Sequence, residues 1–454
     1  MSESLTIKTL HGLKWSYIST ITTAIMQIGY TAVMARLLNP SDFGLVAMGG
    51  VVLRFGSYFA QMGMGSAIIQ KKDLTKGQIS AAFTSSILLG LLFTILTFIL
   101  APLSNFIFKN QDVIPIVRLM GLSFFINGFS LTALALIRRE LKFKSLAIAE
   151  IVSFIIGYLI IGIGSAFLGL GVWSLILASL SQSILLSIFT FSIIRHELSL
   201  SFSWIDYKPL FSFGSKVSLL NFFEFIGYSI ETIFIGRFFG DTNLGYYNRA
   251  QMITNLPISY IINSISKVLY PSLSQIQDDI ERFKRNFFLI IRLSIIILVP
   301  FSIIVYILSR EIVLLILGDK WIESIILVKI LIFAATLDYL QHLLGITLES
   351  KRIIKERIYI QIFYIPILSI VILYFKYIGI YTITIIIFVF YILKFIIYLI
   401  ILNKIKIGFL EFLKNIIFEI ITSIIIFTII TLIYNFIQSL NSNIWFIFIF
   451  TILS

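Results

Sequence analysis

The chain has 454 residues, of which 59% are hydrophobic and 13% are charged, whereas soluble domains are about half apolar and a quarter charged. This composition excludes a compact soluble fold and indicates a membrane protein. Cysteine is absent, which excludes disulfides, cysteine metal sites and thiol nucleophiles. The 35 Lys and Arg residues outnumber the 22 Asp and Glu residues, as expected for cytoplasmic loops of a membrane protein and not for nucleic-acid binding.

Thirteen apolar stretches are each long enough to cross a bilayer, which takes roughly 20 residues. A fourteenth begins near Ile444 and ends at Ser454, so we expect a truncated helix or, as the alternative, a re-entrant end. The predicted fold class is therefore all-α, a polytopic membrane protein with fourteen helices, the last of them incomplete. The thirteen stretches cover about residues 13–38, 43–69, 79–108, 113–137, 146–168, 171–194, 210–239, 244–270, 287–308, 322–348, 358–375, 378–402 and 409–437.

Basic residues are concentrated in alternate connections between these stretches, as in the run from Arg138 to Lys144. Because cytoplasmic loops carry the positive charge, we expect the N-terminus in the cytoplasm. That basic run either contacts lipid phosphates at the inner leaflet or only sets the topology. All the connections are short, so no loop holds a catalytic domain, and the chain is predicted to be a carrier and not an enzyme.

One segment of the chain recurs after 201 residues. Arg36-Leu-Leu-Asn-Pro-Ser-Asp42-Phe-Gly44-Leu45 returns as Arg237-Phe-Phe-Gly-Asp-Thr-Asn243-Leu-Gly245-Tyr246, each after an odd-numbered span. We therefore predict two pseudo-symmetric six-helix lobes at 1–201 and 202–403, followed by an additional helix pair at 404–454. Two parallel copies favour alternating access around a central cleft. The alternative is that the pattern only marks a helix end, a turn and a helix start.

Polar residues inside apolar spans are costly, so each is a candidate functional group. The arginines of the second and eighth spans offer forked donors that suit a phosphate. Two glutamates of the seventh span lie two helical turns apart on one face, with a tyrosine between them. Pairing across helices that only fixes the packing is the alternative. The predicted substrate-binding residues are Gln27, Arg54, Glu224, Tyr228, Glu231 and Arg249.

Asp338 and His342 lie four residues apart in the tenth span and are the candidates for proton coupling, with an internal hydrogen bond between them as the favoured alternative. Other basic residues lie near span ends and are expected to extend to the interface. No G-x-x-x-x-G-K-[ST] motif and no metal-ligand spacing occurs, so we expect no cofactor, no metal and no ATP hydrolysis. The residues expected at the interface are Lys267, Arg292, Lys329 and Lys394.

Several segments resemble the polysaccharide flippases of the multidrug/oligosaccharidyl-lipid/polysaccharide exporter superfamily. The similarity is to the Wzx/WzxC-like branch, which includes teichuronic acid exporters, and is specific over about the first 250 residues. The segments that carry it are Leu13-Lys14-Trp15-Ser16, Ala35 to Leu45, Gly63-Met64-Gly65-Ser66-Ala67-Ile68-Ile69-Gln70 and Arg138-Arg139-Glu140-Leu141-Lys142-Phe143.

The resemblance implies a central cavity lined by the first, second, seventh and eighth helices, and a location in the bacterial cytoplasmic membrane. It implies transfer of an undecaprenyl-diphosphate-linked oligosaccharide, the repeat unit of a lipopolysaccharide or exopolysaccharide, from the inner to the outer leaflet. The expected partners are this lipid-linked substrate, membrane lipids and other polysaccharide assembly proteins. The alternatives are a cation-coupled multidrug exporter and a lipid II flippase of the same superfamily.

Overall fold

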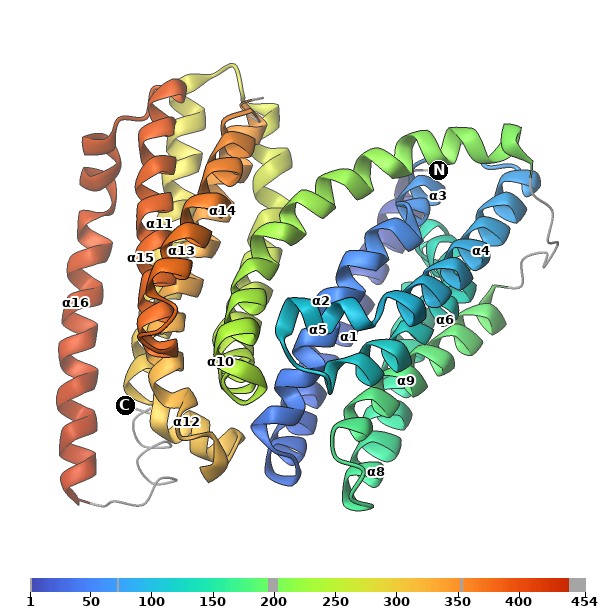
Figure 1. Ribbon diagram of the computed structural model, residues 1–454. Coiled ribbons are helices and arrows are strands. Elements are labelled where there is room, and N and C mark those ends of the chain that lie inside the picture. The colour runs from blue at the N-terminus through green and yellow to red at the C-terminus, as the bar shows by residue number, and fades with distance from the viewer. Residues whose placement is uncertain (1, 72, 195–202, 352, 354, 441–454) are drawn as a thin grey trace. The chain divides into compact units, whose positions relative to one another are not determined.

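The computed structural model describes residues 2–71, 73–194, 203–351, 353 and 355–440, with only the backbone for the start of α1 and for parts of α10 (Figure 1). Every element among these residues is helical, which confirms the all-α prediction. Eleven of the described helical segments are long and apolar enough to cross a membrane. The chain is therefore a multi-pass membrane protein. The predicted fourteenth helix, beginning near Ile444, lies outside the described residues.

The helices divide at α10, which runs from Trp204 to Gln275. Those before it are α1 (Ser2–Leu37), α2 (Pro40–Gln61), α3 (Met64–Gln70), α4 (Lys76–Leu100), α5 (Pro102–Phe108), α6 (Val113–Arg139), α7 (Phe143–Phe154), a π-helical stretch (Ile155–Gly162), α8 (Ile163–Phe167) and α9 (Val172–Ile193). Those after it are α11 (Ile280–Ile307), α12 (Ser309–Ile316), a 3₁₀ turn (Asp319–Trp321), α13 (Ser324–Ser350), α14 (Lys355–Phe375), α15 (Ile380–Ile401), a second 3₁₀ turn (Leu402–Ile405) and α16 (Phe409–Leu440).

Three breaks modify the predicted spans. The second span becomes α2 and α3, because Met62 and Gly63 adopt left-handed backbone angles, with φ of 45° and 61°. The third becomes α4 and α5, with Pro102 at the first position of α5, where its missing N–H costs nothing. The seventh and eighth predicted spans both belong to α10, which is interrupted at Gly240 with φ of 81°. Only glycine adopts that angle without strain.

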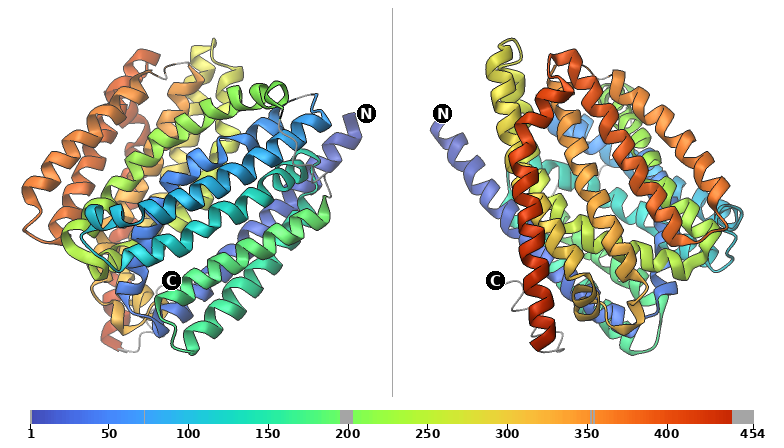
Figure 2. Two further views of the ribbon diagram at one scale, coloured as in Figure 1. Left: turned by 45° about the vertical axis from the view of Figure 1, so that its right-hand side comes forward. Right: turned by 90° about the vertical axis from the view of Figure 1, so that its left-hand side faces the viewer.

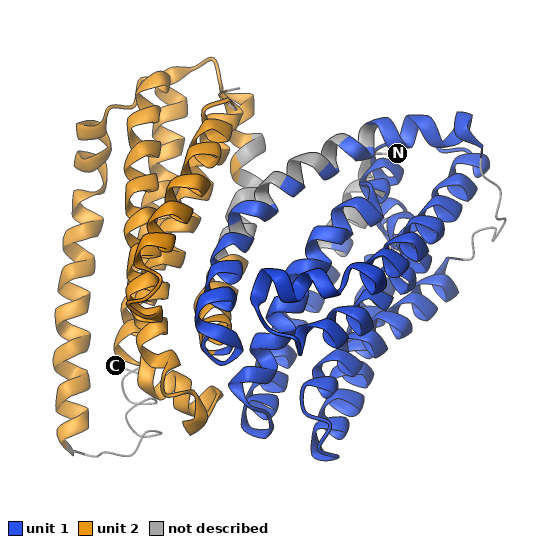
Figure 3. Ribbon diagram, in the orientation of Figure 1, with its two compact units in different colours: residues 1–245 blue, residues 246–454 orange. Residues whose placement is uncertain are grey.

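The chain forms two compact units, residues 1–245 and 246–454, and the division falls inside α10 (Figure 3). In unit 1, α6 packs against α2, α4 and α9, and α1 packs against α7. In unit 2, α11 packs against α13 and α16, and α13 packs against α15 (Figure 2). The lobe boundaries 1–201, 202–403 and 404–454 derived from the sequence repeat stay predictions.

The two copies of the sequence repeat contact each other within unit 1. The carbonyl oxygen of Asp241 occupies the place that a Cβ of Gly44 would take, and the carbonyl oxygen of Pro40 does the same for Gly245. Pro40 and Asp241 are also equivalent positions of the repeat, 201 residues apart. The contact is thus reciprocal, as two-fold related surfaces require, and glycine is what allows the two backbones to approach so closely. We call this contact the glycine clasp.

The second copy of the repeat is held to unit 1 by side chains as well. Arg237 donates from Nη1 to the carbonyl oxygens of Phe106 and Ile107 at the end of α5. A cation at a helix C-terminus satisfies carbonyls that have no partner in the helix. Asn110 donates from Nδ2 to a carboxylate oxygen of Asp241 over 3.0 Å. These contacts explain why unit 1 extends through the start of the second half of α10.

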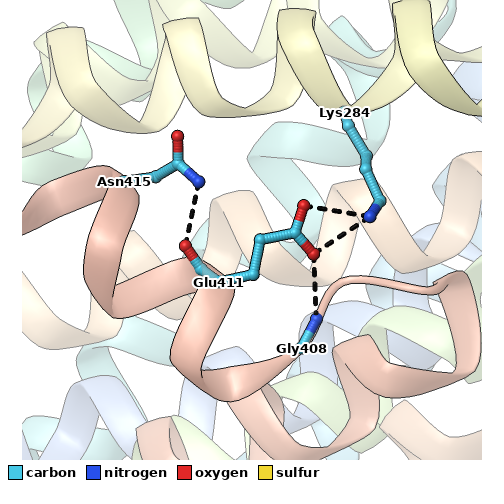
Figure 4. A network of polar contacts seen from close by, with 4 residues as sticks. All are labelled: Lys284, Gly408, Glu411 and Asn415. Atoms are coloured by element: carbon cyan, nitrogen blue, oxygen red, sulfur yellow. Dashed lines mark hydrogen bonds and ion pairs between the residues drawn. The ribbon is translucent and has the colours of Figure 1, made fainter.

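In unit 2, α16 is joined to α11 by a polar seam. Lys284 donates to both carboxylate oxygens of Glu411 at 2.9 Å, and the backbone N–H of Gly408 donates to the same carboxylate (Figure 4). Two turns along α11, Arg292 donates to the backbone and side-chain oxygens of Asn415 at 2.6 and 3.1 Å. The seam thus fixes which face of α16 meets α11.

Arg292 thus contacts a neighbouring helix, and its expected extension to the membrane interface stays a prediction. Its Nε also lies 3.5 Å from an oxygen of Glu419, a buried carboxylate of α16. At the other end of α16, Tyr434 donates to Glu311 over 3.0 Å, and Glu311 is also buried. Buried carboxylates need such partners because an isolated charge in an apolar medium is very costly.

Candidate functional site

A polar pocket of about 350 Å³ lies in unit 2, between the second half of α10 and α13. Its α10 residues recur every three or four positions, so they share one helical face. Tyr339 of α13 forms the opposite wall, and its hydroxyl donates to the backbone oxygen of Asn255 over 3.3 Å. The lining residues are Asn248, Arg249, Gln251, Met252, Asn255, Leu256, Ser259 and Tyr339. We call this cavity the Arg249 pocket.

Arg249 is the one charged residue among those eight, and it is half-buried. Its guanidinium donates from Nη2 to the side-chain oxygen of Asn248 over 2.7 Å, and Nη1 lies 3.4 Å from the sulfur of Met252. These neighbouring residues of α10 therefore orient the planar guanidinium of Arg249 along the pocket wall. A guanidinium held in this way suits a phosphate or carboxylate, which it can bind through two parallel hydrogen bonds.

Arg249, one of the predicted substrate-binding residues, lines this pocket together with residues that were not among the predicted ones, and its role in binding stays a prediction. Asn248, Gln251, Asn255 and Ser259 were missed because each amide or hydroxyl alone is unremarkable in a membrane helix. Their spacing was the available signal, since three-, four- and four-residue steps place them on one side of a helix. Tyr339 follows Asp338 directly in the sequence but belongs to a different helix from Arg249.

The other predicted substrate-binding residues belong to unit 1. Arg54 is exposed on α2 and donates from Nε to Gly50 of its own helix over 3.3 Å. Gln27 is partly exposed on α1, and Glu231 is buried, at 4% exposure, in the first half of α10. The side chains of Glu224 and Tyr228 lie outside the described residues. The predicted set is thus divided between the two compact units.

An aromatic cluster lies beside Arg54. Phe222 of α10 contacts Phe55, Tyr58 and Phe59 of α2, with ring centroids 5.5, 6.5 and 5.3 Å apart, and Phe225 adds a contact to Tyr58 at 5.5 Å. Aromatic edge contacts of this kind add to the packing between helices. Arg54 therefore stands at the edge of an apolar contact between α2 and α10, and its guanidinium is exposed beside that contact.

The two residues predicted for proton coupling, Asp338 and His342, are both half-buried on α13. The charges of Lys394, His342 and Arg357 all act on the carboxylate of Asp338. Arg357 also forms an ion pair with Glu349. Asp338 thus belongs to a network of charges on α13, α14 and α15, in which its interaction with His342 is one of several.

Lys394 was also expected at the membrane interface, which stays a prediction. Its ammonium lies 4.9 Å from the ring centroid of Tyr364 and 5.9 Å from that of Tyr391, in addition to acting on Asp338. Such cation–π contacts stabilise a charge that is partly removed from water. Lys329 similarly lies 5.6 Å from the ring of Tyr306. The side chain of Lys267 lies outside the described residues.

Comparison with known proteins agrees with this architecture. Residues 33–327 match the family described as polysaccharide biosynthesis protein. The chain is 28% identical over 351 residues to an uncharacterized membrane protein in the cps region of Klebsiella pneumoniae, covering 77% of this chain and 72% of that protein. It is 24% identical over 351 residues to the lipopolysaccharide biosynthesis protein WzxC of Escherichia coli K12, covering 77% and 71%.

Among solved structures, the fold is similar to that of the lipid II flippase MurJ in an inward closed conformation. The TM-score is 0.74 and the identity 16%, over 97% of this chain and 96% of that one. At this identity the likeness concerns the fold alone. The family match covers more than half of the chain, and it confirms the resemblance found in the sequence. The chain belongs to the polysaccharide biosynthesis protein family of membrane transporters.

Proposed function

We propose that the protein is a flippase that moves an undecaprenyl-diphosphate-linked oligosaccharide from the inner to the outer leaflet of the cytoplasmic membrane by alternating access. The observation that carries the proposal is the Arg249 pocket, a cationic and amide-lined cavity in a multi-pass member of a polysaccharide biosynthesis family. The N-terminus lies in the cytoplasm in this proposal, because alternate connections hold the basic residues.

The physical task is to carry a diphosphate and several sugars across hydrocarbon. Removing such groups from water without replacement hydrogen bonds has a prohibitive cost. Arg249, and Arg54 in unit 1, replace part of the water around the phosphates, while the prenyl chain remains in lipid. Gln27, Glu224, Tyr228 and Glu231 supply further contacts to the head group in the same proposal.

The membrane potential supplies a driving force without ATP. Moving negative charge outward across an inside-negative membrane is favourable by roughly 2.3 kcal/mol per charge per 100 mV. Asp338 and His342 add a coupling proton in this proposal, since they lie in a network of charges that binding or release of a proton would rearrange. Membrane lipids and other polysaccharide assembly proteins are the proposed partners.

A lipid II flippase is the second candidate, because the fold matches that of MurJ over 97% of the chain. Both substrates are prenyl diphosphates, so the Arg249 pocket serves either of them. A cation-coupled multidrug exporter differs, because its cargo needs no anion-binding arginine. Transport of a prenyl-linked sugar therefore distinguishes a drug exporter from the two flippases. Comparing substrates that carry different sugars distinguishes the oligosaccharide flippase from the lipid II flippase.

The test is leaflet transfer in proteoliposomes that contain the purified full chain and fluorescently labelled undecaprenyl-diphosphate-linked sugar. Arg249→Ala is expected to slow transfer at least tenfold and Arg249→Lys less, because losing one charged hydrogen bond costs about 1.5–3 kcal/mol. Arg118→Ala is the matched control, since this guanidinium lies over the ring of Phe98 at 4.8 Å and outside the pocket. Absence of transfer by the wild type, or an unchanged rate in Arg249→Ala, would contradict the proposal.

A further inference from the structure

We propose that the Arg249 pocket is a sugar-reading subsite, in which the amide face of α10 binds the sugar ring attached to the diphosphate and so selects which head groups are transported. The inference rests on the proposed function and extends it. It concerns the side chains beyond the arginine, chiefly Gln251, Asn255 and Ser259.

The chemistry of the pocket wall favours a sugar over a bare phosphate. Phosphate oxygens only accept hydrogen bonds, so a site built for phosphate alone needs donors and positive charge. The amides of Asn248, Gln251 and Asn255 carry both donors and acceptors, and the hydroxyl oxygens of Ser259 and Tyr339, which already donate to backbone oxygens, add acceptors. Sugar hydroxyls also donate and accept, so they match this wall, whereas a phosphate leaves its acceptors unused.

The size and the apolar patches of the pocket agree with one sugar ring beside a phosphate. A volume of about 350 Å³ is near the lower end of the range of roughly 300–1,000 Å³ for small-molecule sites. It is too small for a whole oligosaccharide with its diphosphate. Met252, Leu256 and the ring of Tyr339 offer apolar surface to the C–H face of a sugar.

The spacing along α10 separates the phosphate-binding arginine from the sugar-binding amides and hydroxyls. Arg249 and Ser259 are ten residues apart, so about 15 Å of helix separates them. The guanidinium stands at one end of the pocket wall, and the amides and hydroxyls extend away from it. A phosphate bound to Arg249 therefore places the attached sugar against Asn255 and Ser259.

Tyr339 is the positioning residue of this arrangement. Its hydroxyl donates to the backbone oxygen of Asn255, which fixes this part of α10 against α13. The adjacent Thr254 is fully buried and donates to the backbone oxygen of Ala250 over 3.1 Å. Asn255 is thus held between a packed face and the pocket, and a fixed hydrogen-bonding group discriminates strongly against a ligand that lacks its partner.

The experiment measures binding to the full chain in nanodiscs with four probes: undecaprenyl diphosphate, and the same lipid diphosphate carrying glucose, galactose or N-acetylglucosamine. Wild type is expected to bind at least one of the sugar-linked probes about tenfold more tightly than the bare diphosphate. The double variant Asn255→Ala/Ser259→Ala should lose this preference and keep its affinity for the bare diphosphate within about twofold, which also shows that it is folded.

Two further variants separate the roles within the pocket. Arg249→Ala should weaken all four probes by a similar factor, because each of them carries the diphosphate. Thr347→Val is the matched control on α13, since its hydroxyl bonds only the backbone oxygen of Leu343, over 2.9 Å, among the contacts described. Its affinities should equal those of the wild type for every probe.

Equal affinity of the wild type for all four probes would overturn the inference, and so would a sugar preference that survives in the double variant. Parallel loss of all affinities in the double variant also contradicts it, because the amides would then support the phosphate. These outcomes leave the proposed function intact if leaflet transfer still occurs. Failure of the wild type to bind or transfer any prenyl diphosphate would instead remove the proposed function itself.

Discussion

The two halves of α10 serve different purposes although they follow each other in the chain. The first half packs against α2 through glycine and aromatic contacts: Gly214 approaches the backbone of Met62 and Gly63, and Ser218 donates to the carbonyl oxygen of Tyr58 over 2.8 Å. The second half turns amides and Arg249 toward a cavity. Gly240, with φ of 81°, lies between them.

This difference shows that one helix can look uniformly apolar in its hydropathy and still contain two parts with different roles. One part packs against a neighbouring helix, and the other lines a pocket. Substitutions in the first half should disturb the fold and any movement that depends on it. Those in the Arg249 pocket should change affinity while the protein stays folded. The predictions that follow test this separation, beginning with the largest effect.

We expect that neither glycine of the glycine clasp can be replaced by a residue with a bulky side chain. Gly44→Val is expected to slow leaflet transfer more than tenfold and to lower the melting temperature by several degrees, because overpacking against a backbone costs about 1–3 kcal/mol or more. Gly245→Val should behave in the same way, since the contact is reciprocal. Thermal unfolding in detergent and transfer in proteoliposomes measure the two effects.

Gly50→Ala in the same helix is the control for the clasp. A Cβ at Gly50 meets no atom within 4 Å, so its melting temperature and transfer rate should stay close to the wild-type values. A Gly44→Val protein as stable and active as Gly50→Ala would show that α2 and the repeat turn do not need their close approach.

The charge network of α13 should act on coupling and not on head-group affinity. Asp338→Asn is expected to slow transfer by about tenfold and to remove its dependence on an imposed pH gradient, because an amide does not bind and release a proton. Binding of undecaprenyl diphosphate should be unchanged. Transfer assays with and without the gradient measure the effect, and a gradient dependence that persists in the variant would exclude Asp338 from coupling.

The polar seam of α16 should produce the smallest effect. Glu411→Ala removes a pair that is partly exposed to the surroundings, so a loss of about 1 kcal/mol in stability is expected. Exchanging the charges in Lys284→Glu/Glu411→Lys should restore most of that loss. Melting temperatures of the single and double variants test this, and a double variant that is no more stable than Glu411→Ala would argue against a direct pair.

The sequence predicted the helical membrane fold well, because a bilayer demands about 20 apolar residues for each span whatever the neighbours are. The repeat is visible in the sequence, and in the structure Gly44 approaches the carbonyl oxygen of Asp241 while Gly245 approaches that of Pro40. The helix breaks at Gly63 and Pro102 were visible in the local sequence, since glycine and proline often interrupt or end helices. Gly240 was equally visible, at the junction of two predicted spans.

The sequence alone could not predict which residues the individual charged side chains contact. Arg292 and Lys394 lie near span ends, and only the packing of α11 on α16 and of α14 on α15 decides that they bind Asn415 and approach Tyr364. The amide face of α10 was missed for a related reason. Asn255 and Ser259 become part of a pocket only because Tyr339 of another helix forms its opposite wall.

The proposed function requires that the Arg249 pocket is accessible to water and receives a prenyl-linked sugar. The chain lacks cysteine, so a single Ser259→Cys variant can be labelled with a water-soluble maleimide in the presence and absence of undecaprenyl-diphosphate-linked N-acetylglucosamine. We predict rapid labelling that the lipid-linked sugar slows, against no labelling at Ile385→Cys on the apolar surface of α15. If the thiol of the Ser259→Cys variant does not react with the reagent, or if the lipid-linked sugar does not slow its labelling, the Arg249 pocket does not bind this substrate.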